Sequence, residues 1–492
     1  MTTIREKTHF YDELSSSRKT WRARNWYYYN KLGQLLVALT PSGRKVLEIG
    51  CGTGELLHEM APKEGVGIDF SRKMLDIAAK QFPELRFVCD NAEHLGLCEP
   101  FDYVILSDLL GEVSDVWQTI HELHKVTDRN SRIIITSYNY LWEPFLQIAE
   151  KLGLKIPQEY QNWLSPSDIE QALNQNDFEV VRQGTYLLLP LHIPVISELI
   201  NRYIAPLPFF QRLCFVQYSV AKTVMTHHDG IIPVPRYKVS VIIPCRNERG
   251  NIESAVERVP DMGAGIEIIF VDGESTDGTI EAIEEMIRRY AGVKRIRLIH
   301  QTSAKTGSAS THPPDKMLHL GKGDAVRKGF DAATGDILMI LDADLTVPPE
   351  ELPRFYHALA SGKGEFINGT RLVYQMEKQA MRTLNLLANK FFSVVFTWLL
   401  GQPIKDTLCG TKVLFRKDYE NIKKQRSFFG ELDPFGDFDL LFGAARQNLK
   451  IVEVPVHYRM RTYGDAKIER FKHGLKLLRM SFIGLKKLKF FS

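Results

Sequence analysis

The sequence predicts an α/β protein with two domains, each built on a mostly parallel sheet covered by helices. Apolar strand-like segments alternate with helix-like segments through residues 45–140, and the alternation begins again at Val239. Such alternation is typical of parallel sheets with helices on both faces. Residues 226–238 contain several proline or glycine breaks, which indicate a linker. We therefore predict a first domain over residues 1–225, a linker over 226–237 and a second domain over 238–492.

The individual strands follow from short apolar runs bounded by turn residues. In the first half we expect strands at 46–49, 65–68, 86–88, 103–106 and 132–136, and in the second half at 239–244, 267–271, 295–300 and 337–341. The stretch 142–226 is richer in Leu, Pro and aromatic residues and does not show this alternation. A chain of 492 residues with 44% hydrophobic content can bury cores of ordinary size.

Composition predicts a cytoplasmic protein. The six cysteines form no CxxC pair, which favours a reduced compartment without disulfides or structural zinc. The first residues lack the apolar core of a signal peptide. No run reaches the roughly 18 apolar residues expected of a membrane span. We expect a soluble or peripheral protein.

Charge is concentrated in the C-terminal segment. Residues 461–492 hold nine Lys or Arg against two acidic residues, whereas the whole chain is only +4. Apolar residues recur there at helical spacing (Phe471, Leu475, Leu478, Phe482 and Leu485), with lysines beside them. Such a basic amphipathic helix suits an anionic membrane surface, which would place the protein at the inner face of the cell membrane. A helix packed on the domain core is the alternative. No stacking platform for nucleic acid is evident, so no nucleic-acid partner is predicted.

The first candidate site is a glycine-rich turn, GCGTG, between an apolar strand and a helix. Gly50, Gly52 and Gly54 permit a tight turn and let a ligand lie against bare backbone. Glu48 stands just before the turn and can orient either the ligand's amino group or the loop itself. A purely structural strand–helix turn is the alternative for a glycine triplet alone.

Acidic or amide side chains also follow the next two predicted strands. Asp69 ends the second strand, about twenty residues after the turn, where a carboxylate can bind ribose hydroxyls. Asp90 and Asn91 end the third strand, in a position suited to an adenine edge. The recurrence of such groups at three consecutive strand ends favours a nucleotide pocket.

The blocks LEIGCGTG, GIDFS, CDNAEHL and FDYVILSDLLGEV resemble those of class I S-adenosylmethionine-dependent methyltransferases. This resemblance implies a Rossmann-like fold for residues 1–225 and S-adenosylmethionine as cofactor. It places Glu48, Gly50, Gly52, Gly54, Asp69 and Asp90 in the cofactor pocket. The methyl acceptor stays open: Asp108 is a candidate base or a helix cap, and His121 a candidate base or a surface residue. Methyl transfer also needs no dedicated base if the reactants are aligned.

The second candidate site contains Asp342 and Asp344, alternate residues at the end of the apolar strand ILMILDADLTVP. Two such carboxylates can bind Mg²⁺ or Mn²⁺ together with a diphosphate, and the metal then stabilises the leaving group. A turn capped by carboxylates before Pro348 is the alternative for this motif alone. The neighbouring blocks IIPCRNE, VDGESTDGT and GKGDAVRKGF favour the metal site.

Together these blocks resemble family 2 inverting glycosyltransferases with the GT-A fold, and most closely the polyprenyl-phosphate sugar transferases that include dolichyl-phosphate mannose synthase. The resemblance implies roles that fall into four groups. Residues expected to surround the nucleobase and ribose are Pro244, Asn247, Glu248, Asp272 and Asp277, and those expected to lie near the sugar nucleotide are Lys322 and Arg327. Asp342 and Asp344 are expected to bind the metal, and Arg371, Arg382 and Lys467 to lie on the acceptor side.

Two positions depart from the family pattern, since Arg246 replaces a usual Tyr and Thr346 a frequent Gln. The donor therefore stays open between UDP- and GDP-sugars. The need for a base depends on the acceptor. A lipid phosphate is already anionic, whereas a sugar hydroxyl needs a nearby carboxylate, for which Asp437 and Asp439 are the candidates. Both residues also suit turns or helix caps.

The sequence as a whole resembles bacterial bifunctional methyltransferase–glycosyltransferase proteins. It predicts metal-dependent sugar transfer from a nucleotide-sugar to a membrane-borne acceptor, polyprenyl phosphate or another lipid-linked group. The fused methyltransferase is expected to act in the same glycan or lipid pathway. Two alternatives remain open: a first domain that only binds S-adenosylmethionine or a docking partner, and a membrane-associated scaffold with an inactive transferase site.

Overall fold

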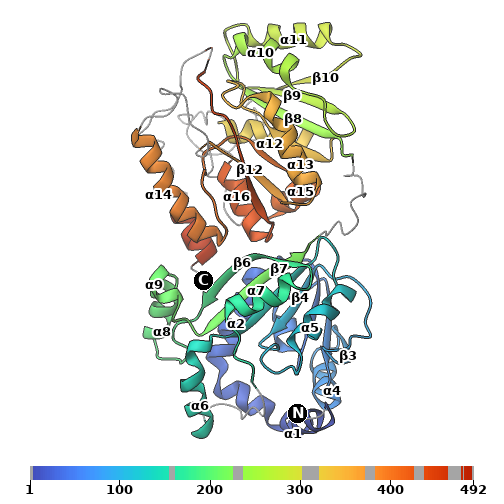
Figure 1. Cartoon of the computed structure of the whole chain (residues 1–492), viewed down its shortest axis with the longest axis vertical. Coiled ribbons are helices and arrows are strands. Elements are labelled where there is room, and N and C mark those ends of the chain that lie inside the picture. Colours follow the sequence, from blue (N-terminus) through green and yellow to red (C-terminus); the bar gives the residue numbers. More distant parts are fainter. Residues whose placement is uncertain are drawn as a thin grey trace, which may run out of the picture. The chain divides into compact units, whose positions relative to one another are not determined.

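The computed structural model describes residues 4–153, 161–224, 236–301, 321–371, 383–425, 437–461, 463, 478–479 and 481–489. The chain divides into two compact units: the first unit comprises Met1–His228 with Lys489–Ser492, and the second comprises Asp229–Leu488. Within the described ranges, each unit contains one seven-stranded sheet with helices around it (Figure 1). The predicted α/β class is confirmed for both units.

The sheet of the first unit has the order β3-β2-β1-β4-β5-β7-β6. Its strands are β1 (Lys45–Ile49), β2 (Glu64–Asp69), β3 (Arg86–Cys89), β4 (Tyr103–Ser107), β5 (Arg132–Tyr138), β6 (Phe178–Tyr186) and β7 (Val216–Thr223). The first five are parallel, and β7 is antiparallel to both β5 and β6. The strand order reverses direction between β1 and β4, and ligands bind at such a point in open α/β sheets.

Two apolar clusters cover the two faces of this sheet. Alternation along β1 decides the faces, because Val46 belongs to one cluster while Leu47 and Ile49 belong to the other. The helices are α1 (Ile4–Arg24), α2 (Trp26–Leu39), α3 (Glu55–Glu59), α4 (Arg72–Gln81), α5 (Val116–Glu122), α6 (Glu143–Lys151), α7 (Pro166–Asn174), α8 (Ile196–Leu199) and α9 (Pro208–Gln211), with the short turns η1 (Leu123–Lys125), η2 (Tyr140–Trp142) and η3 (Ile200–Ile204).

The sheet of the second unit has the order β10-β9-β8-β11-β13-β12-β14. Its strands are β8 (Val239–Cys245), β9 (Ile266–Asp272), β10 (Arg295–His300), β11 (Ile337–Ile340), β12 (Phe366–Thr370), β13 (Lys412–Phe415) and β14 (Ile451–Pro455). The first four in space are parallel, and β13 is antiparallel to β11 and β12. Cys245 pairs with Asp272, so the carboxyl ends of β8 and β9 lie side by side.

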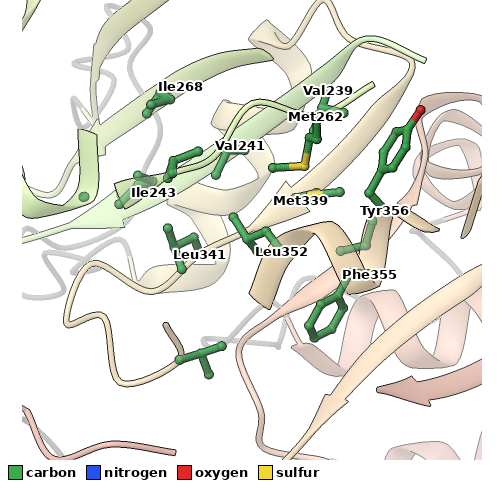
Figure 2. Close-up of a cluster of buried hydrophobic side chains, with 14 of the residues drawn as sticks. Val239, Val241, Ile243, Met262, Ile268, Met339, Leu341, Leu352, Phe355 and Tyr356 are labelled. Atoms are coloured by element: carbon green, nitrogen blue, oxygen red, sulfur yellow. The ribbon is translucent and has the colours of Figure 1, made fainter. Parts of the chain in front are cut away.

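The core of the second unit forms on both faces of this sheet. Figure 2 shows Val241, Ile243 and Met339 packed against Leu352 and Phe355 of α13. The other face packs on α12 (Figure 1). The helices are α10 (Arg249–Arg258), α11 (Thr279–Arg289), α12 (Lys322–Ala332), α13 (Leu352–Ala360), α14 (Thr383–Leu400), α15 (Arg416–Lys424) and α16 (Asp437–Arg446), with the short turns η4 (Pro349–Glu351) and η6 (Leu485–Lys489). Of the helices in the described ranges, none is both long and apolar enough to cross a bilayer.

Candidate active sites

The glycine-rich turn joins β1 to α3 in a conformation that favours glycine. Gly50, Gly52 and Gly54 have φ angles of 77°, 53° and 82°. A Cβ atom at Gly50 would lie 2.8 Å from Leu109, and one at Gly54 would lie 2.9 Å from Phe87. Backbone strain therefore disfavours a side chain at all three positions, and lack of space adds to this at Gly50 and Gly54.

A cavity of about 360 Å³ lies at the carboxyl ends of β1, β2 and β4 in the first unit. Four of the predicted cofactor residues line it: Glu48, Gly50, Gly52 and Asp69. Side chains of α1 and α2 and several aromatic rings form the remainder of its wall. Gly54 is not part of this lining but fixes the turn.

Glu48 is the best indicator of a ligand in this cavity. Its side chain is almost fully buried (1% exposed), and its Oε2 atom has no hydrogen-bond partner. Burial raises the pKa of Glu48 to about 8, although nearby Arg22 opposes the shift. A buried carboxylate oxygen without a partner is costly, and a cationic amino group in the cavity would remove that cost. The residues present thus fit S-adenosylmethionine, which carries such a group.

Asp69 and Asp90 have different surroundings. Asp69 accepts hydrogen bonds from the backbone N–H groups of Gly52 and Ser71, both at 2.9 Å, and so connects the glycine turn to the end of β2. Burial raises the pKa of Asp69, and the two amides oppose this rise. Asp90 lies outside the cavity lining, as does Asn91, and its carboxylate accepts from the Asn91 and Gly96 backbone amides. In this structure Asp90 therefore orders its own loop.

Arg18 of α1 is a candidate cofactor residue that the sequence did not reveal. It lines the cavity, and its buried Nε atom has no hydrogen-bond partner. A Cβ atom at Gly52 would lie 3.7 Å from the Arg18 guanidinium, so this charge stands over the glycine turn. No motif marks a residue so far before the turn, and only the folded chain brings the two together.

Asp108, left open between base and helix cap, lies on the cavity wall directly after β4. Its carboxylate accepts from the Tyr28 hydroxyl and, at 3.1 Å, from the Thr136 hydroxyl. Burial raises the pKa of Asp108 to about 6, opposed by these two hydrogen bonds. Asp115, not Asp108, caps α5, so the cap interpretation is not supported. His121 is exposed and stacks on Trp117, as a surface residue does.

In the second unit, Asp342 and Asp344 follow β11, and each forms an ion pair. Lys322 Nζ of α12 lies 2.5 Å from Asp342, and Arg461 Nη2 lies 2.7 Å from Asp344. Burial opposes the ionisation of Asp342, but Lys322, and then Lys412 and Arg371, hold its pKa below the usual value. The Thr346 hydroxyl donates to Asp344 at 2.9 Å and orders the turn.

Gly410 packs directly on this ion pair. A Cβ atom at Gly410 would lie 2.1 Å from Asp342 Oδ2 and 2.6 Å from Lys322 Nζ. The segment DTLCGTK therefore needs glycine at this position to let its backbone approach the charged groups.

The predicted nucleotide residues gather at the adjacent ends of β8 and β9. Asp272 is buried (1% exposed), and its Oδ1 atom has no hydrogen-bond partner. Asn247 accepts from Thr276 N, and Glu248 accepts from Asn251. The Asp277 carboxylate accepts hydrogen bonds from the backbone N–H groups of Arg249 and Thr279. Burial opposes the ionisation of Asp277, but the Thr279 hydroxyl and these amides lower its pKa. Pro244 lies on β8 opposite Val271.

Arg461 and Tyr463, which follow the last strand of the second sheet, contact residues at these strand ends. Arg461 Nη1 lies 4.0 Å from Glu248 Oε1, in addition to the contact of Arg461 with Asp344. A Cβ atom at Gly250, at the start of α10, would lie 2.5 Å from the Tyr463 ring. Residues 461 and 463 therefore contact both the predicted metal side and the predicted nucleotide side of the site.

Two further predicted residues are paired with carboxylates. The Arg371 guanidinium donates to Asp406 through Nε at 2.7 Å and Nη2 at 2.8 Å, a two-pronged buried pair. Arg327 Nη1 lies 3.4 Å from Asp439, which is buried. Arg382 and Lys467 lie outside the described residues, as does the side chain of Asp437, at whose backbone α16 begins.

Within the described part of the chain, no group of three or more His, Cys, Asp or Glu side chains is arranged to hold a metal ion. Among the described residues, the oxygen donors predicted for this site are the two carboxylates of Asp342 and Asp344. Hard oxygen atoms of this kind fit Mg²⁺ or Mn²⁺ when phosphate oxygens and water complete the coordination.

Comparison with known proteins gives two family matches. Residues 20–183 match the family described as a methyltransferase domain, and residues 240–311 and 318–422 match glycosyl transferase family 2. The chain therefore carries two transferase domains: a Rossmann-like methyltransferase domain in the first unit and a family 2 glycosyltransferase domain in the second. Both family resemblances seen in the sequence, and their fusion in one chain, are confirmed.

Individual relatives extend these matches. The chain is 31% identical over 238 residues to the dolichol-phosphate mannosyltransferase of Pyrococcus furiosus, which covers 47% of this chain and 59% of that protein. It is 28% identical over 237 residues to the polyprenol monophosphomannose synthase of Mycolicibacterium smegmatis, covering 48% and 82%. A Thermotoga maritima structure, titled a SAM-dependent methyltransferase and possible histamine N-methyltransferase, aligns with 44% of this chain and 98% of its own at 18% identity and a TM-score of 0.35.

Proposed function

We propose that the second unit transfers a sugar from a UDP- or GDP-sugar to polyprenyl phosphate, or to another lipid-linked acceptor, with Mg²⁺ or Mn²⁺ as cofactor. One observation carries the proposal: two aspartates at the end of β11, each with a basic partner, lie where the nucleotide-binding strands also end. The relatives named for dolichol-phosphate and polyprenol-phosphate sugar transfer support this acceptor class.

The ion pairs suggest how such a site accepts its donor. Asp342 and Asp344 would bind the cation, while Lys322 and Arg461 would turn to the anionic diphosphate. A bound divalent cation supplies charge stabilisation for the departing nucleoside diphosphate. Asp272, with its unpartnered Oδ1, would accept a hydrogen bond from the nucleoside. We keep Arg371 and Arg382 as candidates for the acceptor phosphate, and Asp437, Asp439 and Lys467 as candidates on the acceptor side.

We further propose that the first unit binds S-adenosylmethionine through Glu48, Asp69 and the glycine turn, and methylates a compound of the same glycan or lipid pathway. The unpartnered Glu48 oxygen supports cofactor binding. The covalent link between the domains is the support for a shared pathway. The proposed boundaries at residues 225 and 238 fall close to the division between His228 and Asp229. A cytoplasmic location at an anionic membrane surface completes the proposal, supported by the basic residues after 461.

The decisive experiment is a panel of UDP- and GDP-sugars incubated with the full chain and a short-chain polyprenyl phosphate, with Mn²⁺, Mg²⁺ or EDTA. Sugar transfer that needs metal and disappears in Asp344→Ala is expected. Turnover that persists in EDTA would overturn the metal assignment, and turnover by Asp344→Ala would overturn the site. An unchanged calorimetric melting transition of the second unit in the same Asp344→Ala protein shows that this unit is folded.

A further inference from the structure

Helix α6 presents an apolar stripe to solvent. Leu141, Phe145, Ile148 and Leu152 follow one another at helical spacing, and their exposed fractions are 44%, 64%, 56% and 67%. None of the residues of α6 is buried. A stripe of this kind normally packs on a protein core, and an exposed one of this size indicates an interaction surface.

The segment 187–213 is built with polar groups inside and apolar groups outside. Buried Ser197 donates to Leu191 O at 2.6 Å and accepts from Ile193 N at 2.8 Å. Buried Asn201 bonds both backbone groups of Leu189 at 2.8 Å. These bonds fix the backbone while the outward side chains stay exposed: Leu191 65%, Val195 70%, Ile196 50%, Leu199 51%, Tyr203 49% and Phe209 74%.

These two exposed surfaces meet at the cavity of the first unit, and we call them together the apolar collar. Phe145 and Leu191 both line the cavity and belong to the exposed surface. Trp142 Nε1 donates to Leu213 O at 2.9 Å, which holds η2 beside the end of the 187–213 segment. Phe145 and Leu191 therefore connect the exposed apolar surface to the cavity.

Asp108, which follows β4, places its carboxylate on the wall of the same cavity. Asp108 accepts from Tyr28 and Thr136 through different carboxylate oxygens, so each oxygen keeps a lone pair. Asp108 also has a φ angle of 55°, a left-handed conformation that a short polar side chain tolerates. A cavity with a carboxylate on its wall and hydrocarbon at its mouth matches an amphiphile.

We propose that the methyl acceptor is an alcohol carried on a lipid, with its hydroxyl at Asp108 and its hydrocarbon chain crossing the apolar collar into a bilayer. The proposal rests on the methyl-transfer function proposed above. As the acceptor oxygen bonds to the methyl carbon, its proton passes to the Asp108 carboxylate. The carbon–sulfur bond of the sulfonium donor breaks, and its electron pair stays on sulfur.

Charge favours an anionic bilayer as the surface that covers the collar. Within the collar, residues 187–213 contain Glu198, Arg202 and Arg212, and residues 140–153 contain Glu143, Glu150 and Lys151. Glu198 pairs with Lys31 at 2.9 Å, so its charge is neutralised within the unit. Three cations, Arg202, Arg212 and Lys151, therefore lie in the same segments as the exposed apolar side chains against two remaining carboxylates, and interfacial proteins combine apolar and basic side chains in this way.

The bilayer part of the proposal is tested by hydrogen exchange on the full chain, with and without phosphatidylcholine vesicles containing phosphatidylglycerol. Backbone protection over residues 140–153 and 187–213 is expected. The double variant Ile148→Glu, Phe209→Glu should lose that protection, whereas Trp117→Glu, which changes an exposed residue on α5, should keep it. Protection confined to residues after 461, or none at all, would overturn the collar assignment.

The head-group part is tested with octyl glucoside below its micelle concentration, followed by hydrogen exchange of the cavity segments, with methyl glucoside as the control without a tail. Octyl glucoside should protect the segments around residues 28 and 108, and Asp108→Asn should weaken its binding about tenfold. Equal binding by Asp108→Asn, or equal effects of the two sugars, would overturn this part. S-adenosylmethionine titration of the same proteins separates the two proposals, because lost cofactor binding contradicts the methyltransferase function rather than the acceptor class.

Discussion

Two charged side chains on the cavity wall of the first unit keep a buried atom without a partner, whereas the two aspartates after β11 in the second unit pair with basic side chains. Glu48 Oε2 and Arg18 Nε are buried without hydrogen bonds. Asp342 and Asp344, by contrast, each contact a basic side chain within 2.7 Å. The unpartnered Asp272 oxygen is the exception in the second unit.

We therefore expect the two units to bind their ligands in different ways. A ligand entering the first cavity supplies missing partners, so the site needs little rearrangement and binding removes a desolvation cost. If the proposed cation and diphosphate bind at the second site, they must exchange existing ion pairs for new ones, so we expect affinity to depend on both arriving together. Four predictions test this contrast.

The largest expected effect concerns the aspartates of the second unit. Asp342→Asn keeps the shape of the side chain but removes its charge, so sugar transfer should fall about a hundredfold to a thousandfold. S-adenosylmethionine binding should not change, because Glu48 and the glycine turn belong to the other unit. Rates of transfer and cofactor titrations on one preparation measure both. A variant that loses both functions would show that the two sites are not independent.

The next prediction concerns the stability contributed by the buried ion pair between Arg371 and Asp406. The Arg371 side chain is 12% exposed and that of Asp406 is 0% exposed, so Arg371→Ala leaves a buried carboxylate alone and should cost about 3–5 kcal/mol of stability in the second unit. Scanning calorimetry should show the transition of that unit lowered. Arg354→Ala removes an exposed side chain that lies 3.9 Å from Glu351, a carboxylate that keeps His457 as a partner; it is the control and should cost at most about 0.5 kcal/mol.

If Arg371 served the acceptor phosphate alone, Arg371→Ala would raise the KM for polyprenyl phosphate without changing the melting temperature. The calorimetric and kinetic results together therefore decide between a structural role and direct acceptor binding.

Glu48→Gln should act in opposite directions on binding and stability. If Glu48 meets the cofactor's amino group as proposed, loss of its charge should weaken binding about tenfold to a hundredfold. Because burial raises the pKa of Glu48 from 4.5 to about 8, the folded protein keeps a proton that the unfolded chain loses above about pH 4.5. Glu48 therefore destabilises the fold increasingly as the pH rises from about 4.5 to about 8.

Glu48→Gln removes this penalty, and its melting temperature at pH 7.5 should rise by a few degrees. Glu64→Gln, at the exposed start of β2, should leave both quantities unchanged. A Glu48→Gln protein that binds the cofactor as well as the parent would contradict the assigned partner.

The smallest expected effect is the release of protons when S-adenosylmethionine binds. At pH 7 Glu48, with a pKa of about 8, is mostly protonated in the free protein. Binding of a cationic amino group should lower that pKa, so up to about one proton should leave on binding. Calorimetric titration in two buffers with different ionisation enthalpies measures the release, and equal heats in both buffers would count against Glu48.

Local patterns predicted the parallel half of each sheet well, because each of those strands is a short apolar run between turns. The antiparallel β7 was not predicted. It carries polar residues such as Gln217, which is buried at 3% exposure and bonds Ser137 on β5 at 2.9 Å. Polar residues in a buried strand depend on partners from elsewhere in the chain, so a linear pattern cannot identify them.

The candidate sites show the same limit. Glu48, Gly50, Gly52 and Asp69 all line the cavity because their motif is local, and their role in cofactor binding stays a prediction. Asp344 and Arg461 are far apart in sequence, and so are Gly52 and Arg18, which contact only in the folded chain. Asp90 illustrates the converse: its position after β3 predicted a ligand contact, yet its carboxylate accepts from nearby backbone amides.

The position of Arg461 and Tyr463 has a practical consequence for shortening the protein. The last strand of the second sheet ends at Pro455, which would be an attractive place to truncate a soluble catalytic fragment. Such a fragment would lack the guanidinium that contacts Asp344 and the ring that covers Gly250. Fragments intended for crystallography or enzyme assays should therefore extend beyond residue 463, because a shorter one would have an altered donor site even if its sheet folds.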